Sequence, residues 1–397
     1  MNTKMKNIVI SCSFVFFLVL FMFINIFAKD KAVSYEERRK LARFPQFKTE
    51  KLTNGEYFEE MEEYFLDQFY LRENFRKIKT FVNTKVFNEK DNNDIYIVDN
   101  AIYKMEYKLN EKSIYNSANL YNKIAQTYFK NSNVYYTIVP DKNYFVAKEH
   151  GYLHLDYDKL ISIMKNNTNN MKYIDITKDL KISDYYRTDL HWKQENITQI
   201  GDKILQIMGL QSSKNKATNN NKINNDSKVN YNEQTNVDNK PNLAYNKKTF
   251  EPFYGSYYGQ AASNIKPDKL TYLSDKIIQN CKVYDYEKQK YIKVYDDKDF
   301  DNIDSYDVFL GGAKSLLTIE NPSNTSGKEL YIFRDSFGSS LSPLLIKNYS
   351  KIHLIDLRYI NSTQFEKHIN IQKNSDVLFM YNTSILNNSS IITRFFR

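Results

Sequence analysis

Three apolar runs near the C-terminus constrain the fold of this 397-residue chain most narrowly, because segments of helical character separate them. The runs Glu329–Phe333, Lys351–Ile355 and Asp376–Met380 are short and apolar, which is typical of strands. A turn and a helix from about Ser339 follow the first run. Strands that alternate with helices predict a parallel sheet with crossover helices, an α/β fold, whose functional residues lie in loops at the strand C-termini.

The preceding part of the chain extends this pattern. Asn133–Val139 and Tyr173–Ile176 are typical of strands, and Ile114–Phe129 is typical of an amphipathic helix. The pair Asp99-Asn100 lies between two apolar runs and predicts a hairpin. Two further helices are predicted from apolar residues at spacings of three and four, namely Phe58, Met61, Phe65 and Phe69, and Ile197, Ile200, Ile204 and Ile207.

The N-terminus carries an apolar run from Ile8 to Ala28 with no charged residue, preceded by Lys4 and Lys6. A run of roughly 21 residues is long enough to span a bilayer. Ala28 ends a poor cleavage site for a signal peptidase, so we expect residues 1–28 to be an uncleaved signal anchor, a transmembrane helix. The basic end would stay inside and the rest of the chain would be exported. A cleaved signal peptide and a buried soluble helix are the alternatives.

The remainder divides into two parts. Residues 29–90 are expected to form a juxtamembrane and helical segment, and residues 91–397 a catalytic domain. Within that domain, residues 211–248 are dense in Asn, Lys and Ser and almost free of aliphatic side chains. Such a segment cannot bury enough apolar surface to offset its ordering entropy, so we expect a disordered insertion that splits one domain.

Charge and cysteine content say less about the class of protein than the N-terminal apolar run does. The net charge is +9, which favours anionic partners or simply reflects a lysine-rich solvated surface. No arginine-rich stripe or nucleic-acid motif is present, so we expect no nucleic-acid partner. Cys12 lies inside the apolar run, which leaves Cys281 without an intradomain disulfide partner and does not determine the compartment.

Metal and cofactor motifs are weak. His150 and His154 have the spacing of two ligands but no third ligand supports them, and the sequence has no Cys-x-x-Cys pair. A phosphate-binding loop and a dinucleotide glycine fingerprint are both missing from the sequence. We therefore expect neither a metal nor a tightly bound cofactor.

Ser336 is the candidate nucleophile. It follows the strand Glu329–Phe333 closely, and Gly338 permits a tight turn into the next helix. A serine at such a turn lies beside free backbone N–H groups and the positive end of a helix, which can hold an oxyanion. The alternative is that Asp335 or Ser336 merely caps that helix.

Asp189-Leu190-His191-Trp192 supplies the partners that such a serine requires. A serine hydroxyl is a weak nucleophile without an adjacent base, and His191 can accept its proton. Asp189 can fix the imidazole tautomer and stabilise the imidazolium. The alternatives are a structural histidine and an aspartate that N-caps a helix starting near Trp192, whose own side chain is expected to pack rather than react.

The two motifs, in this order, resemble those of the DHHW family of bacterial exported proteins, which is related to the alginate O-acetyltransferase proteins of the SGNH-hydrolase superfamily. The resemblance covers residues 35 to 397 apart from the insertion, and the order of the motifs is more specific than any one of them. The other segments that carry it are Glu36–Pro45, Asn54–Phe58, Asp67–Arg72, Val139–Lys142, Tyr254–Ser256, Asp356–Tyr359 and Tyr381–Thr383.

The resemblance implies an SGNH-hydrolase-like parallel sheet with flanking helices and a shifted block order, in which the Asp/His block precedes the serine block. It makes Ser336 the nucleophile, His191 the base and Asp189 the residue that orients the base. Arg358 and Asn382 follow the next two strands and are implied as substrate or oxyanion contacts, with a salt bridge and a turn residue as the alternatives. Lys142 either touches an anionic substrate or is solvated.

This sequence departs from the family at two positions. Leu190 replaces the second histidine of the family name, and it should point away from the site if the backbone is extended. Phe337 replaces a more usual tyrosine after the serine, which would remove one polar contact with substrate.

The implied function is a membrane-anchored extracytoplasmic O-acetyltransferase that acetylates a cell-surface or exopolysaccharide through an acetyl-serine. A membrane-bound O-acyltransferase partner would supply the acetyl groups. The alternatives are a polysaccharide acetyl esterase of the same fold and a noncatalytic cell-surface protein that binds glycan or organises export.

Overall fold

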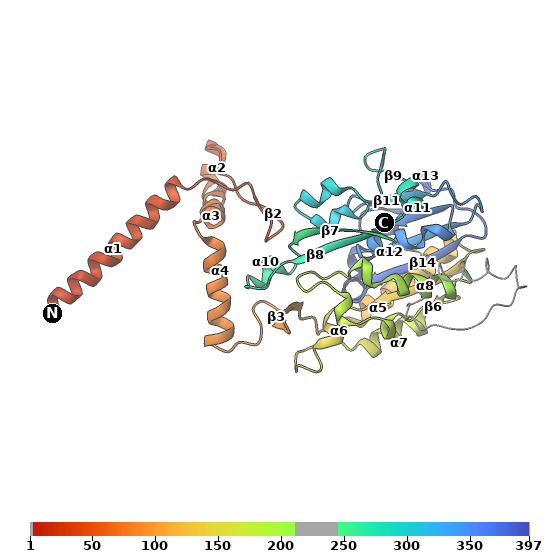
Figure 1. Cartoon of the computed structure of the whole chain (residues 1–397), viewed down its shortest axis with the longest axis horizontal. Helices are drawn as coiled ribbons and strands as arrows, with labels where there is room; N and C mark the ends of the chain where they lie inside the picture. Colours follow the sequence, from red (N-terminus) through yellow and green to blue (C-terminus); the bar gives the residue numbers. More distant parts are fainter. Residues whose placement is uncertain (1–2, 211–244, 397) are drawn as a thin grey trace, which may run out of the picture.

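An eight-stranded sheet forms the centre of the molecule (Figure 1). The structure is a computed structural model that describes residues 3–210 and 245–396. In spatial order the strands are β10 (Lys290–Ile292), β9 (Lys282–Asp285), β11 (Leu316–Glu320), β13 (Lys351–Ile355), β12 (Glu329–Arg334), β14 (Asp376–Asn382), β5 (Asn133–Val139) and β6 (Lys172–Tyr173).

The sheet is parallel from β13 to β6 and antiparallel from β13 to β10. The predicted α/β fold class, a largely parallel sheet with flanking helices after one N-terminal apolar helix, is confirmed. The strand predicted at Tyr173–Ile176 is shorter than expected, because β6 already ends at Tyr173. Since β12, β14 and β5 are parallel neighbours, the loops after all three lie at one edge of the sheet.

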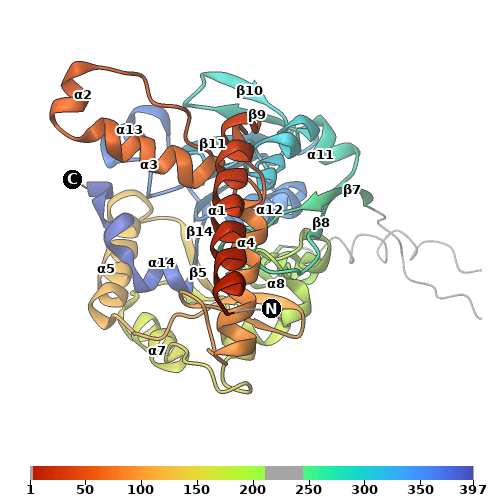
Figure 2. The same cartoon turned by 90° about the vertical axis from the view of Figure 1, so that its left-hand side faces the viewer.

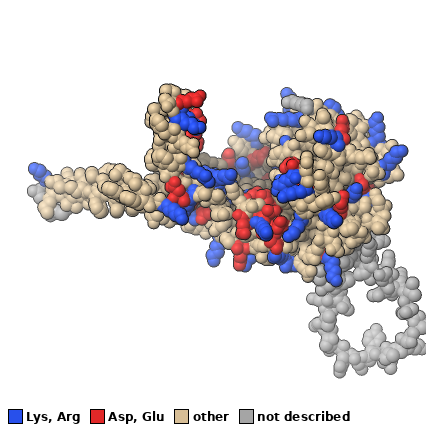
Figure 3. All heavy atoms as spheres, turned by 90° about the horizontal axis from the view of Figure 1, so that it is seen from above, with Lys and Arg blue, Asp and Glu red and all other residues tan. Residues whose placement is uncertain are grey.

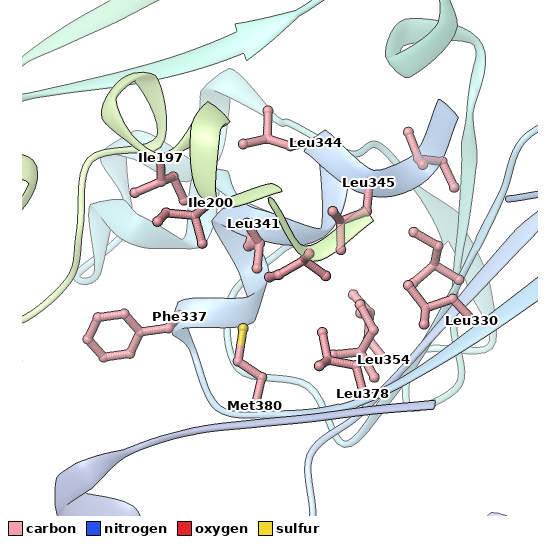
Figure 4. Packing of buried hydrophobic residues seen from close by; sticks show 14 of the residues in the cluster. Ile197, Ile200, Leu330, Phe337, Leu341, Leu344, Leu345, Leu354, Leu378 and Met380 are labelled. Atoms are coloured by element: carbon pink, nitrogen blue, oxygen red, sulfur yellow. The ribbon is translucent and has the colours of Figure 1, made fainter. Parts of the chain in front are cut away.

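Helices cover both faces of the sheet, and alternate residues of β12 show how. Leu330 and Ile332 belong to one buried cluster, whereas Tyr331 and Phe333 belong to the other, as the two-residue period of a strand requires. The first cluster contains side chains of α8 (Thr198–Ile207) and α12 (Phe337–Leu345), shown in Figure 4. The second cluster includes residues of α5 (Glu111–Tyr128), α7 (Tyr157–Asn167), α13 (Ser362–His368) and α14 (Thr383–Asn387).

Two ribbons stand outside the large sheet. The predicted hairpin is present as β3 (Ile95–Val98) and β4 (Ala101–Lys104), with Asp99 and Asn100 both at positive φ in the turn. β7 (Asn246–Phe253) pairs with β8 (Asp268–Ser274). Most of the predicted insertion lies outside the described residues, and β7 already occupies the last residues of that range.

Shorter helices connect these elements. The α-helices are α6 (Asn143–Val146), α10 (Tyr258–Ala261) and α11 (Lys276–Asn280). The 3₁₀ helices are η2 (Thr177–Asp179), η3 (Ile182–Asp184), η4 (Gln194–Asn196), η5 (Asp297–Asp301), η6 (Ser305–Val308), η7 (Ile346–Asn348), η8 (Ser389–Ile391) and η9 (Thr393–Phe396).

The N-terminal helix α1 (Thr3–Phe27) projects from the rest of the molecule (Figure 1). Its most apolar window has a mean hydropathy of 2.6, and the helix is long and apolar enough to cross a membrane. Figure 3 shows it almost free of charged side chains, with blue only at its far end.

The N-terminal segment, residues 29–90, lies between α1 and the sheet domain (Figures 1 and 2). It contains the two-residue strands β1 (Val33–Ser34) and β2 (Arg39–Lys40), then α2 (Thr49–Thr53), α3 (Glu56–Gln68), α4 (Arg72–Phe81) and a π-helical turn, η1 (Val82–Val86). The predicted helix around Phe58–Phe69 is therefore present. Its aromatic face is not buried, since Phe58 and Phe65 are 62% and 58% exposed.

Candidate active site

Ser336 lies in the turn between the central strand β12 and helix α12, at the edge of the sheet where the parallel strands end. The adjacent Asp335 accepts the Phe337 N–H at 3.0 Å and so caps the helix. Gly338 is required in this turn, because a Cβ atom there would lie 2.8 Å from Cβ of Arg334. The Ser336 hydroxyl makes no capping bond and is directed elsewhere.

The structure brings Ser336, His191 and Asp189 together. His191 Nε2 lies 2.6 Å from Ser336 Oγ, and His191 Nδ1 lies 2.6 Å from Asp189 Oδ1. With the proton on Nδ1, the imidazole donates to the carboxylate and accepts from the serine hydroxyl. These contacts have the geometry of a Ser-His-Asp relay. The helix expected to start near Trp192 begins at Gln194 with η4 and continues as α8, so Asp189 does not cap it.

Asp189 is completely buried and has a donor at every accepting position. Oδ1 also accepts the His191 N–H at 2.8 Å, and Oδ2 accepts the Ser256 N–H at 2.6 Å and Arg38 Nη1 at 3.0 Å. Burial alone raises the pKa of this carboxyl, but the charge and hydrogen bond of His191 and the charge of Arg38 outweigh it. The pKa of Asp189 is therefore well below its ordinary value, and the group is a carboxylate.

The two donors on Asp189 Oδ2 come from segments that the motif analysis left without a role. Arg38 lies in the β1–β2 turn at positive φ, and its guanidinium also pairs with Asp304. Ser256 belongs to the loop after β7, which approaches the Asp189 backbone closely, since a Cβ atom on Gly255 would lie 2.2 Å from the Thr188 carbonyl oxygen. Both segments are among those that resemble the DHHW family. Neither shows a periodic or spacing signal that could assign it to the site from sequence alone.

Aromatic side chains enclose the imidazole. The ring of Tyr306 stacks on His191 at 4.0 Å between centroids with an interplanar angle of 9°. Phe337 lies 4.9 Å away and is buried, so its ring packs against His191 instead of offering a contact to substrate. Trp192 is completely buried and donates from Nε1 to Ser340 Oγ at 2.8 Å, which agrees with its expected packing role.

Lys142 is neither solvated nor free for a substrate, which corrects both expectations for this residue. It is buried, and its Nζ donates to the carbonyl oxygens of Ile102, Arg187 and Asp189 at 2.6, 2.9 and 3.1 Å. The ammonium group therefore fixes the backbone on either side of the relay. Burial lowers the pKa of Lys142 to about 7, against the attraction of nearby carboxylates.

Arg358 and Asn382 both lie at the same sheet edge but are engaged elsewhere. Arg358 forms a two-pronged pair with Asp356, with Nε and Nη2 at 2.9 and 2.7 Å from the carboxylate oxygens. Asn382 caps α14 by accepting the Ser384 N–H, and its amide nitrogen donates to the Val139 carbonyl at 3.1 Å. Their roles as substrate or oxyanion contacts stay predictions.

Leu190 is half-buried and packs against the core cluster that contains α8 and α12. A cavity with a volume of about 820 Å³ lies between the N-terminal segment and the sheet domain. Its lining includes Tyr35, Tyr254 and Ser305 but not Ser336. Among the described residues, no group of three His, Cys, Asp or Glu side chains is placed to hold a metal ion.

Comparison with solved structures shows what this fold is similar to. A DHHW family protein from Eubacterium siraeum aligns with a TM-score of 0.57 and 20% identity, over 77% of this chain and 97% of that one. Bacillus cereus PatB1 with a sulfonyl adduct aligns with a TM-score of 0.56 and 17% identity, over 76% and 100%. The O-acetyltransferase domain of Pseudomonas putida AlgJ aligns with a TM-score of 0.38 and 11% identity, over 74% and 92%.

No family model and no curated protein matches the sequence. At these identities the alignments with the DHHW family protein and with PatB1 show that the fold is shared. They cover 97% and 100% of those two proteins, and 77% and 76% of this chain. The likeness to the DHHW family, expected from the motifs, is confirmed at the level of structure.

Proposed function

We propose that this chain is a membrane-anchored, extracytoplasmic O-acetyltransferase that acetylates a cell-surface or exopolysaccharide. The observation that carries the proposal is the continuous path from Ser336 through His191 to Asp189, with both links at 2.6 Å. The single N-terminal apolar helix supports the anchor, and a membrane-bound O-acyltransferase partner is the proposed source of acetyl groups.

In the proposed reaction, His191 Nε2 takes the hydroxyl proton as Ser336 Oγ attacks the carbonyl carbon of an acetyl donor. The tetrahedral adduct collapses, the leaving group departs with that proton, and an acetyl-serine remains. A sugar hydroxyl then attacks the acetyl carbon and gives its proton to His191. Ser336 Oγ leaves and recovers the proton, so the acetyl group has moved to the sugar.

The start of α12 offers the developing oxyanion one backbone donor. Asp335 accepts the N–H groups of Phe337, through Oδ1, and of Gly338, through its carbonyl. Within the described part of the chain, the Ser336 N–H has no acceptor. A donor beside the nucleophile at a helix N-terminus is suited to an oxyanion. Arg358 and Asn382 are the proposed further contacts.

Replacing Ser336 by alanine tests the proposal. Ser336→Ala should lower the turnover of p-nitrophenyl acetate by about a thousandfold or more, because the acetyl group loses its acceptor. The exposed Ser390 provides a matched control, and Ser390→Ala should retain full turnover. Full turnover in Ser336→Ala, with folding verified by circular dichroism, would contradict the proposal.

A sulfonyl fluoride and a product analysis separate the alternatives. The probe should form a sulfonyl ester at Ser336 with loss of fluoride, located by peptide mass spectrometry. Lack of labelling would favour a noncatalytic glycan-binding protein. Acetyl groups recovered on an added oligosaccharide indicate transfer, whereas acetate alone indicates an esterase of the same fold.

A further inference from the structure

The outer faces of α3 and α4 carry side chains that a soluble helix normally buries. Six of them are 41% to 62% exposed and form what is here called the apolar strip: Phe58, Phe65, Phe69, Phe75, Ile78 and Phe81. Single exposed apolar residues need no explanation, but a continuous exposed patch marks an interaction surface.

Polar side chains of both helices contact the rest of the protein. In α3, Asp67 pairs with Arg39 and accepts the Ala42 N–H at 2.8 Å. In α4, Arg76 Nη2 donates to the Gly259 carbonyl at 2.6 Å, and the Thr80 hydroxyl donates to the Ala261 carbonyl at 3.1 Å. α4 is thus amphipathic in the reverse of the usual sense, with most of its polar side chains inward. α3 shares this inward polar contact through Asp67 but also carries exposed glutamates, Glu56, Glu59, Glu62 and Glu63.

The apolar strip is continuous with α1. The ring of Phe21 in α1 lies 6.2 Å from the rings of both Phe69 and Phe75, and the Tyr70 N–H donates to Asn25 Oδ1 at 2.8 Å. Phe21 precedes the end of α1 by about 9 Å along the axis. Figure 2 looks onto the side of the molecule from which α1 projects and shows α2, α3 and α4 spread across it.

We propose that the apolar strip lies in the headgroup–acyl boundary of the bilayer that α1 crosses, so that α3 and α4 are interfacial helices. The proposal rests on the anchoring in the proposed function. The position of Phe21 matches the depth of roughly 5–10 Å to which interfacial helices bury their apolar side. Exposed Lys79 and Lys85 lie on and just after α4, where they can reach lipid phosphates.

A bilayer fits these contacts better than a protein partner does. The tie between Tyr70 and Asn25 holds the start of α4 against the membrane end of α1. Lipid is therefore the first apolar material that the strip meets when α1 is inserted. A second copy of the chain would need its own α1 in the same place.

Labels on the strip can test this in the full chain. The two native cysteines are replaced (Cys12→Ala, Cys281→Ala), and a single cysteine carrying an NBD fluorophore is introduced by Phe65→Cys, Phe75→Cys or Ile78→Cys. The protein is placed one copy per nanodisc in equal parts of phosphatidylcholine and phosphatidylglycerol. Strip labels should be protected from aqueous iodide about threefold or more relative to a surface label, and quenched by doxyl-labelled lipid.

Three further positions serve as controls. Tyr291→Cys and Tyr359→Cys report comparably exposed aromatic positions on the sheet domain, at 56% and 53% exposure, and should remain accessible to iodide. Val15→Cys in α1 reports insertion of the anchor. Protected Val15 with strip labels as accessible as Tyr291 would overturn the proposal. Strip labels protected only in native membranes would also overturn it and indicate a protein partner. Ester turnover at Ser336 is measured separately, so a failure of the proposed chemistry leaves these readings unaffected.

A second inference concerns Arg38, which comes from the N-terminal segment and contacts the relay. Its guanidinium is largely buried, bridges Asp189 and Asp304, and shares Asp189 Oδ2 with the Ser256 N–H. We infer that Arg38 is a positioning residue of the proposed reaction, which holds the Asp189 carboxylate in the plane of the imidazole. The catalytic geometry then depends on the segment that joins the sheet domain to α1.

Arg38→Met should lower kcat by about 10–100-fold with little change in KM, since a misplaced carboxylate affects the transition state and not binding. The pH–rate profile should change as well, because a positive charge is lost from beside the Asp189 carboxylate. Arg38→Lys should restore part of both. Wild-type kcat and an unmoved profile in Arg38→Met would overturn the inference.

Two variants keep this test decisive. Arg43→Met changes an exposed arginine of the same segment and should leave both kcat and the pH profile unchanged. Asp304→Asn removes the other partner of the guanidinium and should give a smaller loss of kcat than Arg38→Met. If Arg38→Met does not fold, Asp304→Asn takes its place in the test, and a wild-type kcat in Asp304→Asn would then count against the inference. Activity in Ser336→Ala would contradict the proposed function instead.

Discussion

At the residue scale, Asp335 and Ser336 are adjacent but have different partners. The Asp335 carboxylate accepts the N–H groups of Phe337 and of Asn382, at 3.0 and 2.7 Å, and thereby joins the start of α12 to the end of β14. The Ser336 hydroxyl is left to His191. The sequence offers both residues as helix caps, and only the structure shows that the aspartate takes that position.

The buried Lys142 should make the free energy of unfolding depend on pH. Its pKa is lowered by burial to about 7 in the folded protein, below the ordinary value near 10.5. Between these values the unfolded chain binds a proton that the folded protein does not. The free energy of unfolding should therefore rise with pH from about 7 to 10.5, by up to about 1.4 kcal/mol per pH unit from this residue. Urea unfolding at several pH values measures the slope.

The contribution of Lys142 should disappear in Lys142→Met, which lowers the slope relative to the wild type, and it should persist in Lys148→Met, which changes an exposed lysine nearby. Equal slopes in the wild type and Lys142→Met would show that Lys142 stays protonated. The three carbonyl oxygens around Nζ would then hold all three ammonium hydrogens across this range.

Sequence reasoning brought the relay together but missed what surrounds it. Ser336, His191 and Asp189 carry recognisable side-chain chemistry at characteristic places in the fold. Arg38 is 151 residues from Asp189, and an ion pair between distant segments leaves no periodic trace in the sequence. The stacking of Tyr306 on His191 likewise depends on how a 3₁₀ turn packs.

At the element scale, the loop after β7 packs closely against the backbone of Thr188 and Asp189, which leaves no room for a side chain at Gly255. Gly255→Ala would place a methyl group 2.2 Å from the Thr188 carbonyl oxygen. The loop must then move, and the Ser256 N–H must leave Asp189. We expect a loss of about 1–3 kcal/mol in the free energy of unfolding, from urea titrations followed by circular dichroism, together with reduced ester turnover.

Gly201 in α8 is the matched control. Its added methyl group would lie 3.6 Å from the nearest side-chain atom, an ordinary contact. Gly201→Ala should be neutral or stabilising by up to about 1 kcal/mol, since alanine favours a helix over glycine. A Gly255→Ala protein as stable and active as Gly201→Ala would show that the loop is not held closely.

Elements with a strong period were predicted well, and their surroundings were not. The strands β12 and β13 begin where the apolar runs begin, and α5 covers the expected residues except the last, Phe129. The aromatic period of α3 predicted a helix with one apolar face, and the structure leaves that face exposed. Periodicity shows which side of a helix is apolar but does not show what covers it.

At the scale of the whole molecule, the N-terminal segment has two different sides, one exposed and apolar and one in polar contact with the sheet domain. One side of it carries the apolar strip, and the other side carries Arg38 and Arg76 to the sheet domain. The fold of the sheet domain could be predicted, because the apolar periods of its strands and helices are visible in the sequence. The placement of the N-terminal segment depends on polar contacts between surfaces, which single-sequence patterns do not record.

The single tryptophan gives the protein an intrinsic optical reporter. Trp192 follows His191 in sequence, and its indole is hydrogen-bonded to Ser340 on the helix that starts beside Ser336. All tryptophan emission from this protein therefore originates within a few side chains of Ser336 and His191. Rapid-mixing fluorescence can follow events at this one place without any added dye.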